Sequence, residues 1–176
     1  GPVATAQQHE DVRAGIDALA RDGRLVYGNG ALKPIGAPDG KGYFVSPVLL
    51  EVEPGAAAPT VHSREVFGPV ATLVPYSGRA DDAAAIVSRG QGGLVSSVYS
   101  EDVAFTSDVV LGLAPFHGRV FLGSVKIAEQ SPGPGTVLPA LVHGGPGRAG
   151  GGEELGGLRG LEFYMQRVAL EGSRPV

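Results

Sequence analysis

Residues 70–122 alternate between strand-like and helix-like patterns, and this alternation limits the possible folds more than any other feature of the sequence. Apolar runs rich in valine predict strands, and stretches with apolar residues at helical spacing predict helices between them. The strands are predicted at 70–76, 94–99 and 120–122, and the helices at 81–89 and 100–113. Strands separated by helices at this spacing are typical of βαβ units. The sequence therefore predicts an α/β fold, with an open and mostly parallel sheet flanked by helices.

A further helix is predicted at 5–22, where apolar residues also recur at helical spacing. Thr5 and Gln8 form a capping box at its start, and Gly23 suits a left-handed exit at its end. For the two later helices, the predicted caps are Asp81 or Asp82 and then Ser100.

The remaining segments are less regular. Strands are predicted at 25–27 and 43–50, the second near a sheet edge because Pro47 cannot donate a ladder hydrogen bond. Residues 124–152 show no periodicity, and a loop of that length in a compact domain is usually functional. A short helix at 155–163 and a last strand at 164–170 complete the prediction.

Composition argues against several classes of partner. The 176 residues are enough for one domain, and we expect residues 1–176 to form a single domain. The formal net charge is −4 and no basic run is present, so nothing favours binding to nucleic acid or to an anionic membrane. No apolar stretch approaches the roughly 18 residues of a membrane-spanning helix. No secretory pattern is visible in the first residues, and we expect a cytoplasmic protein.

Several chemistries also have little support. The four histidines are scattered without the spacing of metal ligands, and Gly-x-Ser-x-Gly is absent. With no cysteine, the chain has no disulfide, no thiolate metal site and no cysteine nucleophile. The glycine-rich run 144–157 contains neither of the two phosphate-binding glycine motifs in its required context. We interpret it as a surface loop whose glycines permit close backbone approach.

Two interpretations compete for Glu65 and Phe67, in the stretch "HSREVFGPVATLVPY" at 62–76. In the first, Glu65 is a solvated surface carboxylate and Phe67 fills the core. In the second, the Glu65 carboxylate accepts hydrogen bonds from two adjacent hydroxyls of a ligand, and Phe67 forms an aromatic wall beside it. Open α/β sheets more often bind ligands at the carboxyl ends of strands, whereas this pair precedes a strand. Spacing alone leaves both interpretations open.

Several segments together resemble one family. "EVFGPV", residues 65–70, resembles the E-x-F-G-P motif of the aldehyde dehydrogenase superfamily. Further along the chain, "GGLVSSVYSED" is similar to the family's G-L-x-x-x-V-x-[ST]-x-D segment, and "GRVFLGS" stands where the family has a G-x-[VI]-x-[VI]-N strand. At the two ends, "GPVATAQQHEDV" resembles the family's G-P-[LV] and helix, and "GGPGRAGGGEELGGLRGLEFYMQR" stands in place of G-G-x-K-x-S-G-x-G-R-E-L-G and the closing strand. Order and spacing fit over essentially the whole chain.

The resemblance implies the catalytic-domain fold of aldehyde dehydrogenases, with NAD or NADP as cofactor. It implies that Glu65 hydrogen-bonds the nicotinamide-ribose hydroxyls and that Phe67 packs beside the ribose and nicotinamide. It also implies a small-molecule aldehyde substrate and a homo-oligomer. The Pro-Gly-rich late loop, "LVHGGPGRAGGGEELGG", resembles the branch that oxidises CoA-thioester semialdehydes in the aerobic degradation of phenylacetate and benzoate.

Part of the family's machinery does not carry over to this chain. In the family a cysteine attacks the aldehyde, and this chain has no cysteine. That cysteine, the general-base Glu, the oxyanion-hole Asn and the dinucleotide-binding domain all precede the family's G-P-[LV] segment. The chain therefore resembles the C-terminal part of a catalytic domain, truncated at its N-terminus, and no catalytic residue is assigned within it. Gly123 also stands where many members have Asn, and the Lys of G-G-x-K is absent.

Two functions from different classes follow. In the first, the chain is part of an NAD(P)-dependent aldehyde dehydrogenase and is inactive alone because the nucleophile is missing. In the second, the chain is a standalone, non-catalytic binding or oligomerisation module. If the first is right, we expect an unusually large apolar patch where the missing domain would cover this one.

Overall fold

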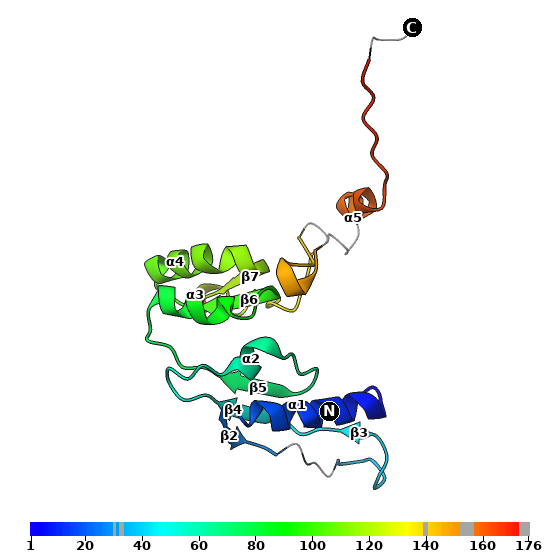
Figure 1. Ribbon diagram of the computed structural model, residues 1–176, viewed down its shortest axis with the longest axis vertical. Coiled ribbons are helices and arrows are strands. Elements are labelled where there is room, and N and C mark those ends of the chain that lie inside the picture. The colour runs from blue at the N-terminus through cyan, green and yellow to red at the C-terminus, as the bar shows by residue number, and fades with distance from the viewer. Residues whose placement is uncertain (30, 32–33, 139–140, 152–156, 173–176) are drawn as a thin grey trace. The chain divides into compact units, whose positions relative to one another are not determined.

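The computed structural model describes residues 1–29, 31, 34–138, 141–151 and 157–172. The chain forms two compact units, unit 1 (Gly1–Gly90) and unit 2 (Gln91–Val176). Each unit combines helices with strands, as Figure 1 shows. That residues 1–176 act as a single domain stays a prediction.

Unit 1 is built on a mixed three-stranded sheet. The strands of the whole unit are β1 (Pro2–Val3), β2 (Arg24–Tyr27), β3 (Tyr43–Phe44), β4 (Val48–Glu51) and β5 (Val70–Leu73). Its helices are α1 (Ala6–Leu19), α2 (Pro59–Ser63) and α3 (Ala80–Ser88). The sheet order is β2-β4-β5, in which β4 is antiparallel to β2 and parallel to β5. β1 and β3 form a separate antiparallel pair.

β4 is therefore a central strand, and its predicted position near a sheet edge is wrong. The predicted strand 43–50 is divided into β3 and β4, and Pro47 lies in the gap between them. β4 begins at Val48, whose N–H donates to the Pro69 carbonyl at 2.9 Å. Because Pro47 stands just before the strand, its missing N–H removes no hydrogen bond from the sheet.

α1 begins at its predicted cap, Thr5, but the Gln8 side chain reaches back to the residue before the cap and not to Thr5 itself. The Thr5 hydroxyl oxygen accepts a hydrogen bond from the Gln8 N–H at 3.1 Å, and the Gln8 side-chain oxygen accepts one from the Ala4 N–H at 3.0 Å. At the other end, Gly23 does not have the predicted left-handed backbone. A Cβ on Gly23 would lie 2.6 Å from the Glu51 carbonyl oxygen, so this glycine permits a close backbone approach instead.

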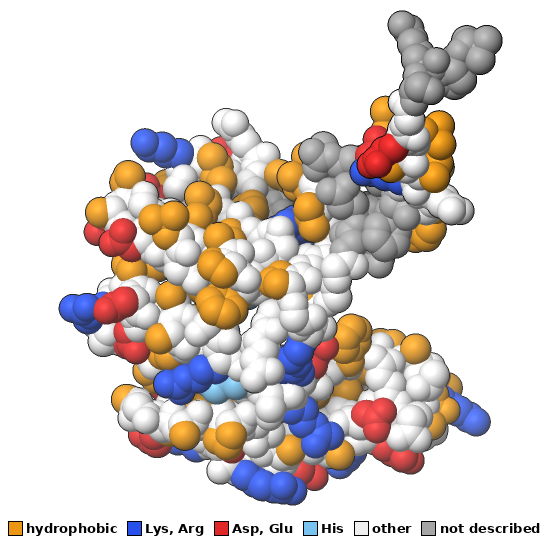
Figure 2. All heavy atoms as spheres, turned by 45° about the horizontal axis from the view of Figure 1, so that its top comes forward, with side chains coloured by type: hydrophobic (Ala, Val, Ile, Leu, Met, Phe, Trp, Pro, Cys, Tyr) orange, Lys and Arg blue, Asp and Glu red, His pale blue; other side chains and the backbone are white. Residues whose placement is uncertain are grey.

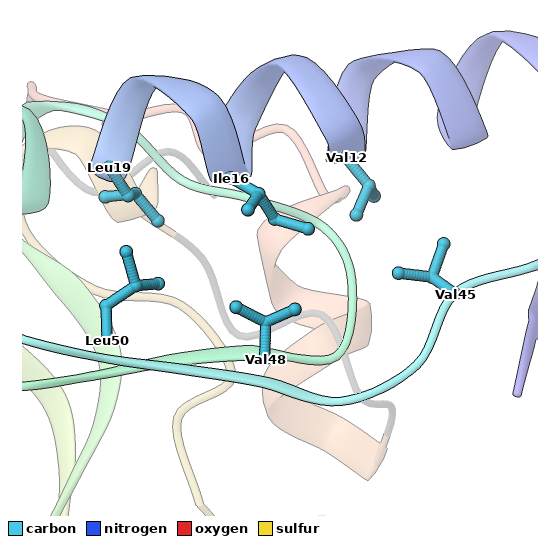
Figure 3. Close-up of a cluster of buried hydrophobic side chains, with 6 residues drawn as sticks. All are labelled: Val12, Ile16, Leu19, Val45, Val48 and Leu50. Atoms are coloured by element: carbon cyan, nitrogen blue, oxygen red, sulfur yellow. The ribbon is translucent and has the colours of Figure 1, made fainter. Parts of the chain in front are cut away.

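The core of unit 1 lies between α1 and the strand region beneath it. Figure 3 shows three side chains of α1 pointing toward three from the segment that ends in β4, and together they form the buried cluster Val12, Ile16, Leu19, Val45, Val48 and Leu50. Val45 and Leu50 are fully excluded from solvent. Burial of such side chains stabilises a fold by about 1.5–3 kcal/mol each. The core therefore fixes α1 against the segment that ends in β4.

Unit 2 contains the βαβ unit that the sequence predicts. β6 (Gly93–Tyr99) and β7 (His117–Gly123) pair in parallel, with Gly93 opposite His117 and Tyr99 opposite Gly123. They are joined by α4 (Val103–Leu113), which packs on both strands (Figure 1). Short helical turns η1 (Ala114–Phe116), η2 (Val125–Ile127) and η3 (Gly147–Ala149) and the helix α5 (Gly157–Phe163) complete the unit.

The caps of α3 and α4 differ from the predicted ones. The Asp102 carboxylate, not Ser100, caps α4 by accepting from the Phe105 N–H at 3.0 Å. Arg79 occupies the cap position of α3, and Asp81 and Asp82 lie in its first turn. The Asp82 carboxylate instead accepts from the Ser77 N–H at 2.7 Å, so it closes the turn before the helix.

The segment after β7 returns to the strands through glycines, which confirms the predicted close backbone approach. A Cβ on Gly145 would lie 2.4 Å from the Gly93 carbonyl oxygen, and one on Gly147 would lie 2.1 Å from the Gln91 carbonyl oxygen. The Arg148 N–H donates to the Gln91 carbonyl at 3.1 Å. The predicted strand at 164–170 is not formed, and residues 155–156 of the predicted helix lie outside the described residues. In the described ranges, no helix has the length and apolarity needed to cross a membrane.

Candidate functional site

Glu65 and Phe67 lie in the irregular stretch 64–69 that joins α2 to β5, hereafter the 64–69 segment. Both side chains are exposed, and Phe67 keeps 72% of its surface accessible. The interpretation of Phe67 as a core residue is therefore wrong. The exposed Glu65 carboxylate is compatible with a solvated surface group and with a ligand-binding acceptor.

Val66, between them, is turned toward the interior. It is partly buried and packs against the core cluster. A methyl group on Gly15 of α1 would lie 2.7 and 2.8 Å from the two γ-carbons of Val66, so helix and segment touch directly at this glycine. Val66 thus anchors the segment, while its two neighbours remain exposed.

Two tight turns explain the Gly-Pro pair that follows. The Gly68 N–H donates to the Val66 carbonyl at 2.9 Å, and the Val70 N–H donates to the Gly68 carbonyl at 2.8 Å. These three-residue turns are centred on Phe67 and Pro69, and such turns are common where strands begin. A Cβ on Gly68 would lie 2.7 Å from both γ-carbons of Val12, so a larger residue does not fit. Phe67 stands at the apex of the first turn, which accounts for its exposure.

Two polar side chains, whose contacts with this region were not predicted from the sequence, hold α2 and the 64–69 segment. The Gln8 side-chain amide donates to the Phe67 carbonyl at 3.2 Å. The Asp22 carboxylate accepts from the backbone N–H groups of Thr60 and Val61, at 2.5 and 3.1 Å, at the start of α2. No local pattern links either residue to the segment, because the partners are 59 and 38 residues away.

A signal for the contact with α1 was present at Gly15. A glycine inside a helix costs about 1 kcal/mol relative to alanine, so an interior glycine often marks a close approach by another part of the chain. Gly15 is buried in the middle of α1, against Val66.

The electrostatics of α2 favour a neutral histidine. Burial, and secondarily the positive charge of Arg89, lower the pKa of His62 below its ordinary value of 6.5, and the negative charge of Asp22 opposes this shift. At neutral pH the imidazole is therefore uncharged. Among the described residues, no three His, Asp or Glu side chains gather in a way that could hold a metal ion.

Each unit has a hollow near the carboxyl ends of its parallel strands. The hollow of unit 1, about 370 Å³, follows β4 and β5 and is lined by residues that include Glu53, Tyr76, Asp82 and Arg89. The hollow of unit 2, about 450 Å³, follows β6 and β7 and is lined by residues that include Ser100, Thr106, Leu122, Ser124 and Lys126. Neither lining includes Glu65 or Phe67.

The aldehyde dehydrogenase family model matches residues 1–169, and the chain belongs to this family. It is 40% identical to the MaoC protein of Klebsiella aerogenes over 175 residues, which cover 98% of this chain and 50% of that protein. It is 42% identical to the 3,4-dehydroadipyl-CoA semialdehyde dehydrogenase of Aromatoleum evansii over 147 residues, which cover 83% of this chain and 28% of that enzyme. The chain thus spans half or less of the length of these relatives.

The fold agrees with the family. The solved structure of PnpE in complex with nicotinamide adenine dinucleotide superimposes with a TM-score of 0.63 at 26% identity, over 85% of this chain and 28% of that one. Together with the parallel pairs β4–β5 and β6–β7, this likeness confirms the predicted α/β fold.

Gly123, which replaces the family's Asn at the end of β7, has a structural explanation. A Cβ on Gly123 would lie 2.3 Å from a ring carbon of Tyr99 on the neighbouring strand. The tyrosine ring therefore fills the space that a side chain at position 123 would need.

Proposed function

We propose that this chain is part of an NAD(P)-dependent aldehyde dehydrogenase that oxidises a CoA-thioester semialdehyde to a carboxylic acid. Membership of the family and the 42% identity to 3,4-dehydroadipyl-CoA semialdehyde dehydrogenase support this activity and substrate class. The observation that carries the proposal is the exposed pair Glu65 and Phe67, presented by a segment anchored on the core.

The chemistry of this pair fits the ribose end of a nicotinamide dinucleotide. The two oxygens of the Glu65 carboxylate can accept hydrogen bonds from two adjacent hydroxyls, and the exposed Phe67 ring offers an apolar face beside them. When bound, the dinucleotide supplies the hydride acceptor. The likeness to a structure solved with nicotinamide adenine dinucleotide supports this cofactor class. The proposal includes both NAD and NADP.

The role of this chain is to orient the cofactor. Val66 and Gly68 press against α1, and Gln8 holds the Phe67 carbonyl, so Glu65 is presented on a backbone with little freedom to move. Such rigidity matters because a misplacement of about 1 Å can cost on the order of a hundredfold in rate. The chain has no cysteine, and we propose that it does not oxidise aldehydes alone.

A chimera tests the proposal. In it, this chain replaces the matching segment of the A. evansii dehydrogenase, which is assayed with 3,4-dehydroadipyl-CoA semialdehyde and with both NAD⁺ and NADP⁺. We expect dinucleotide-dependent oxidation, and we expect Glu65→Gln to raise the KM for the dinucleotide and leave the KM for the aldehyde nearly unchanged. A folded chimera that is equally active with and without Glu65 would refute the assigned role.

The isolated chain serves as the matched control. We expect it to show no turnover with either dinucleotide, and turnover above the blank would disprove the argument from the absent cysteine. The alternative, a standalone binding or oligomerisation module, predicts that a folded chimera oxidises no aldehyde, and that Glu65→Gln leaves its affinity for the dinucleotide unchanged. The chimera therefore separates the two functions.

We also propose that the protein forms a homo-oligomer. Unit 2 carries large apolar side chains at its surface, among them Val103 and Leu111 of α4, which are 79% and 75% exposed. Figure 2 shows hydrophobic atoms interspersed with charged ones on the face that it presents. Exposed apolar area of this kind favours association. Size-exclusion chromatography with light scattering measures the state, and a monomer at all concentrations contradicts the proposal.

A further inference from the structure

The five-residue helix α2 has no cap of its own. Its first residue, Pro59, has no N–H, and the residue before it, Ala58, has only a methyl side chain, which accepts no hydrogen bond. Ala58 also adopts the left-handed backbone, with φ 41° and ψ 56°, which is unusual for a residue other than glycine. A helix this short is not stable by itself, so its geometry depends on contacts from outside.

Asp22 supplies the missing cap from 38 residues away. One carboxylate oxygen accepts from the Thr60 and Val61 N–H groups, at 2.5 and 3.1 Å, and the other accepts from the Thr60 hydroxyl at 3.1 Å. Asp22 itself is held in the turn that ends α1, where its N–H donates to the Leu19 carbonyl at 3.0 Å. The first free donors of α2 are therefore tied to the end of α1.

The capped turn leads straight into the 64–69 segment. The Arg64 N–H donates to the Thr60 carbonyl at 2.9 Å, and Glu65 is the next residue. Gln8, near the opposite end of α1, holds the Phe67 carbonyl. The segment that presents Glu65 and Phe67 is thus attached to the α1 region at both of its ends.

We propose that Asp22 is a positioning residue, which sets where Glu65 and Phe67 lie by capping α2. Asp22 touches neither the cofactor nor the reacting atoms and acts through the backbone of Thr60 and Val61. The ligand assigned to the Glu65–Phe67 pair rests on the proposed function. The coupling of Asp22 to the segment does not depend on it.

Hydrogen exchange on the 176-residue chain tests the coupling without any assay of activity. Asp22→Ala removes both acceptor oxygens, and we expect amide exchange in residues 60–68 to accelerate by about five- to thirtyfold, as the loss of a helix cap implies. Asp22→Asn keeps one side-chain oxygen, and we expect it to restore most of the protection. Asp17→Ala, an exposed aspartate on α1, is the matched control and leaves exchange in residues 60–68 unchanged.

The chimera described above tests the positioning role. We expect Asp22→Ala to raise the KM for the dinucleotide by up to the same factor, because the binding-competent position of the segment is populated less. The KM for the aldehyde stays unchanged, and Asp22→Asn restores most of the affinity. A merely structural role would lower the amount of active enzyme and leave both KM values as they are.

The outcomes separate this inference from the proposed function. Unchanged exchange in residues 60–68 of Asp22→Ala overturns the coupling, and accelerated exchange with an unchanged dinucleotide KM overturns the positioning role. An inactive but folded wild-type chimera overturns the proposed function alone. If Asp22→Ala unfolds unit 1 as a whole, the partial loss in Asp22→Asn decides: a smaller acceleration confined to residues 60–68 supports the coupling, and acceleration spread evenly over unit 1 overturns it.

Discussion

Replacing Gly15 by alanine tests whether α1 fixes the 64–69 segment through direct contact with Val66. Alanine favours the helix by about 1 kcal/mol over glycine. The added methyl, however, would lie 2.7 and 2.8 Å from the Val66 γ-carbons. Optimal carbon contacts are about 3.5–4.0 Å, so helix and segment must separate by about 1 Å. Overpacking of this kind costs about 1–3 kcal/mol. We expect the overlap to outweigh propensity, and the free energy of unfolding to fall by about 1 kcal/mol.

Urea denaturation of a double-mutant cycle measures this contact. Val66→Ala removes both γ-carbons and leaves only a β-carbon at 3.3 Å from the new methyl, a distance that a small shift accommodates. In that background Gly15→Ala should recover the propensity gain of about 1 kcal/mol. The change caused by Gly15→Ala therefore reverses sign between the two backgrounds, which gives a coupling energy of about 2 kcal/mol.

Ala14→Gly is the matched control, because Ala14 is the exposed neighbour of Gly15 on the same helix. It reports helix propensity without the contact and should cost about 1 kcal/mol in both backgrounds. If Gly15→Ala and Val66→Ala are additive within about 0.5 kcal/mol, residue 15 and the segment do not press on each other and the reasoning is refuted.

Three further predictions concern stability. Leu50→Ala in the fully buried core should lower the free energy of unfolding by about 2–5 kcal/mol, whereas Leu111→Ala, at a 75% exposed position, should change it by less than about 0.5 kcal/mol; urea denaturation checks both. The pKa of folded His62 lies below 6.5, so the unfolded chain takes up a proton first as the pH falls. Stability should therefore decrease from about pH 6.5 downward, and denaturation of His62→Gln at several pH values should lack this component; identical pH profiles contradict it. Asp102→Ala should cost about 1 kcal/mol through loss of the α4 cap, while Asp108→Ala on the exposed face of α4 should cost less, as thermal unfolding would show.

Local patterns predicted the elements whose stabilising partners are near in sequence. The hydroxyl of Thr5 and the N–H of Gln8 are three residues apart, so the start of α1 was predictable. The βαβ order of β6, α4 and β7 was predictable because hydrophobic periodicity distinguishes strands from helices. The E-x-F-G-P pattern likewise identified Glu65 and Phe67 as the candidate pair.

Other features depended on contacts between distant residues and could not be predicted in this way. The central position of β4 follows from its pairing with both β2 and β5, although Pro47 suggested an edge. The residues at 164–170 have an apolar content that suits a strand, but no strand pairs with them among the described residues. Ser100 and Asp102 are both good caps, and the path of the chain selects Asp102.

By itself, the sequence determined the α/β class, the βαβ order of β6, α4 and β7, and the pair of side chains on which the proposed function depends. Only the tertiary structure decided that Phe67 is exposed while Val66 is turned inward, that Gln8 bonds the Phe67 carbonyl, and that Asp22 caps the helix before the segment. The physical reason is that periodicity and capping act over a few residues, whereas α2 and the 64–69 segment make hydrogen bonds across 38 and 59 residues.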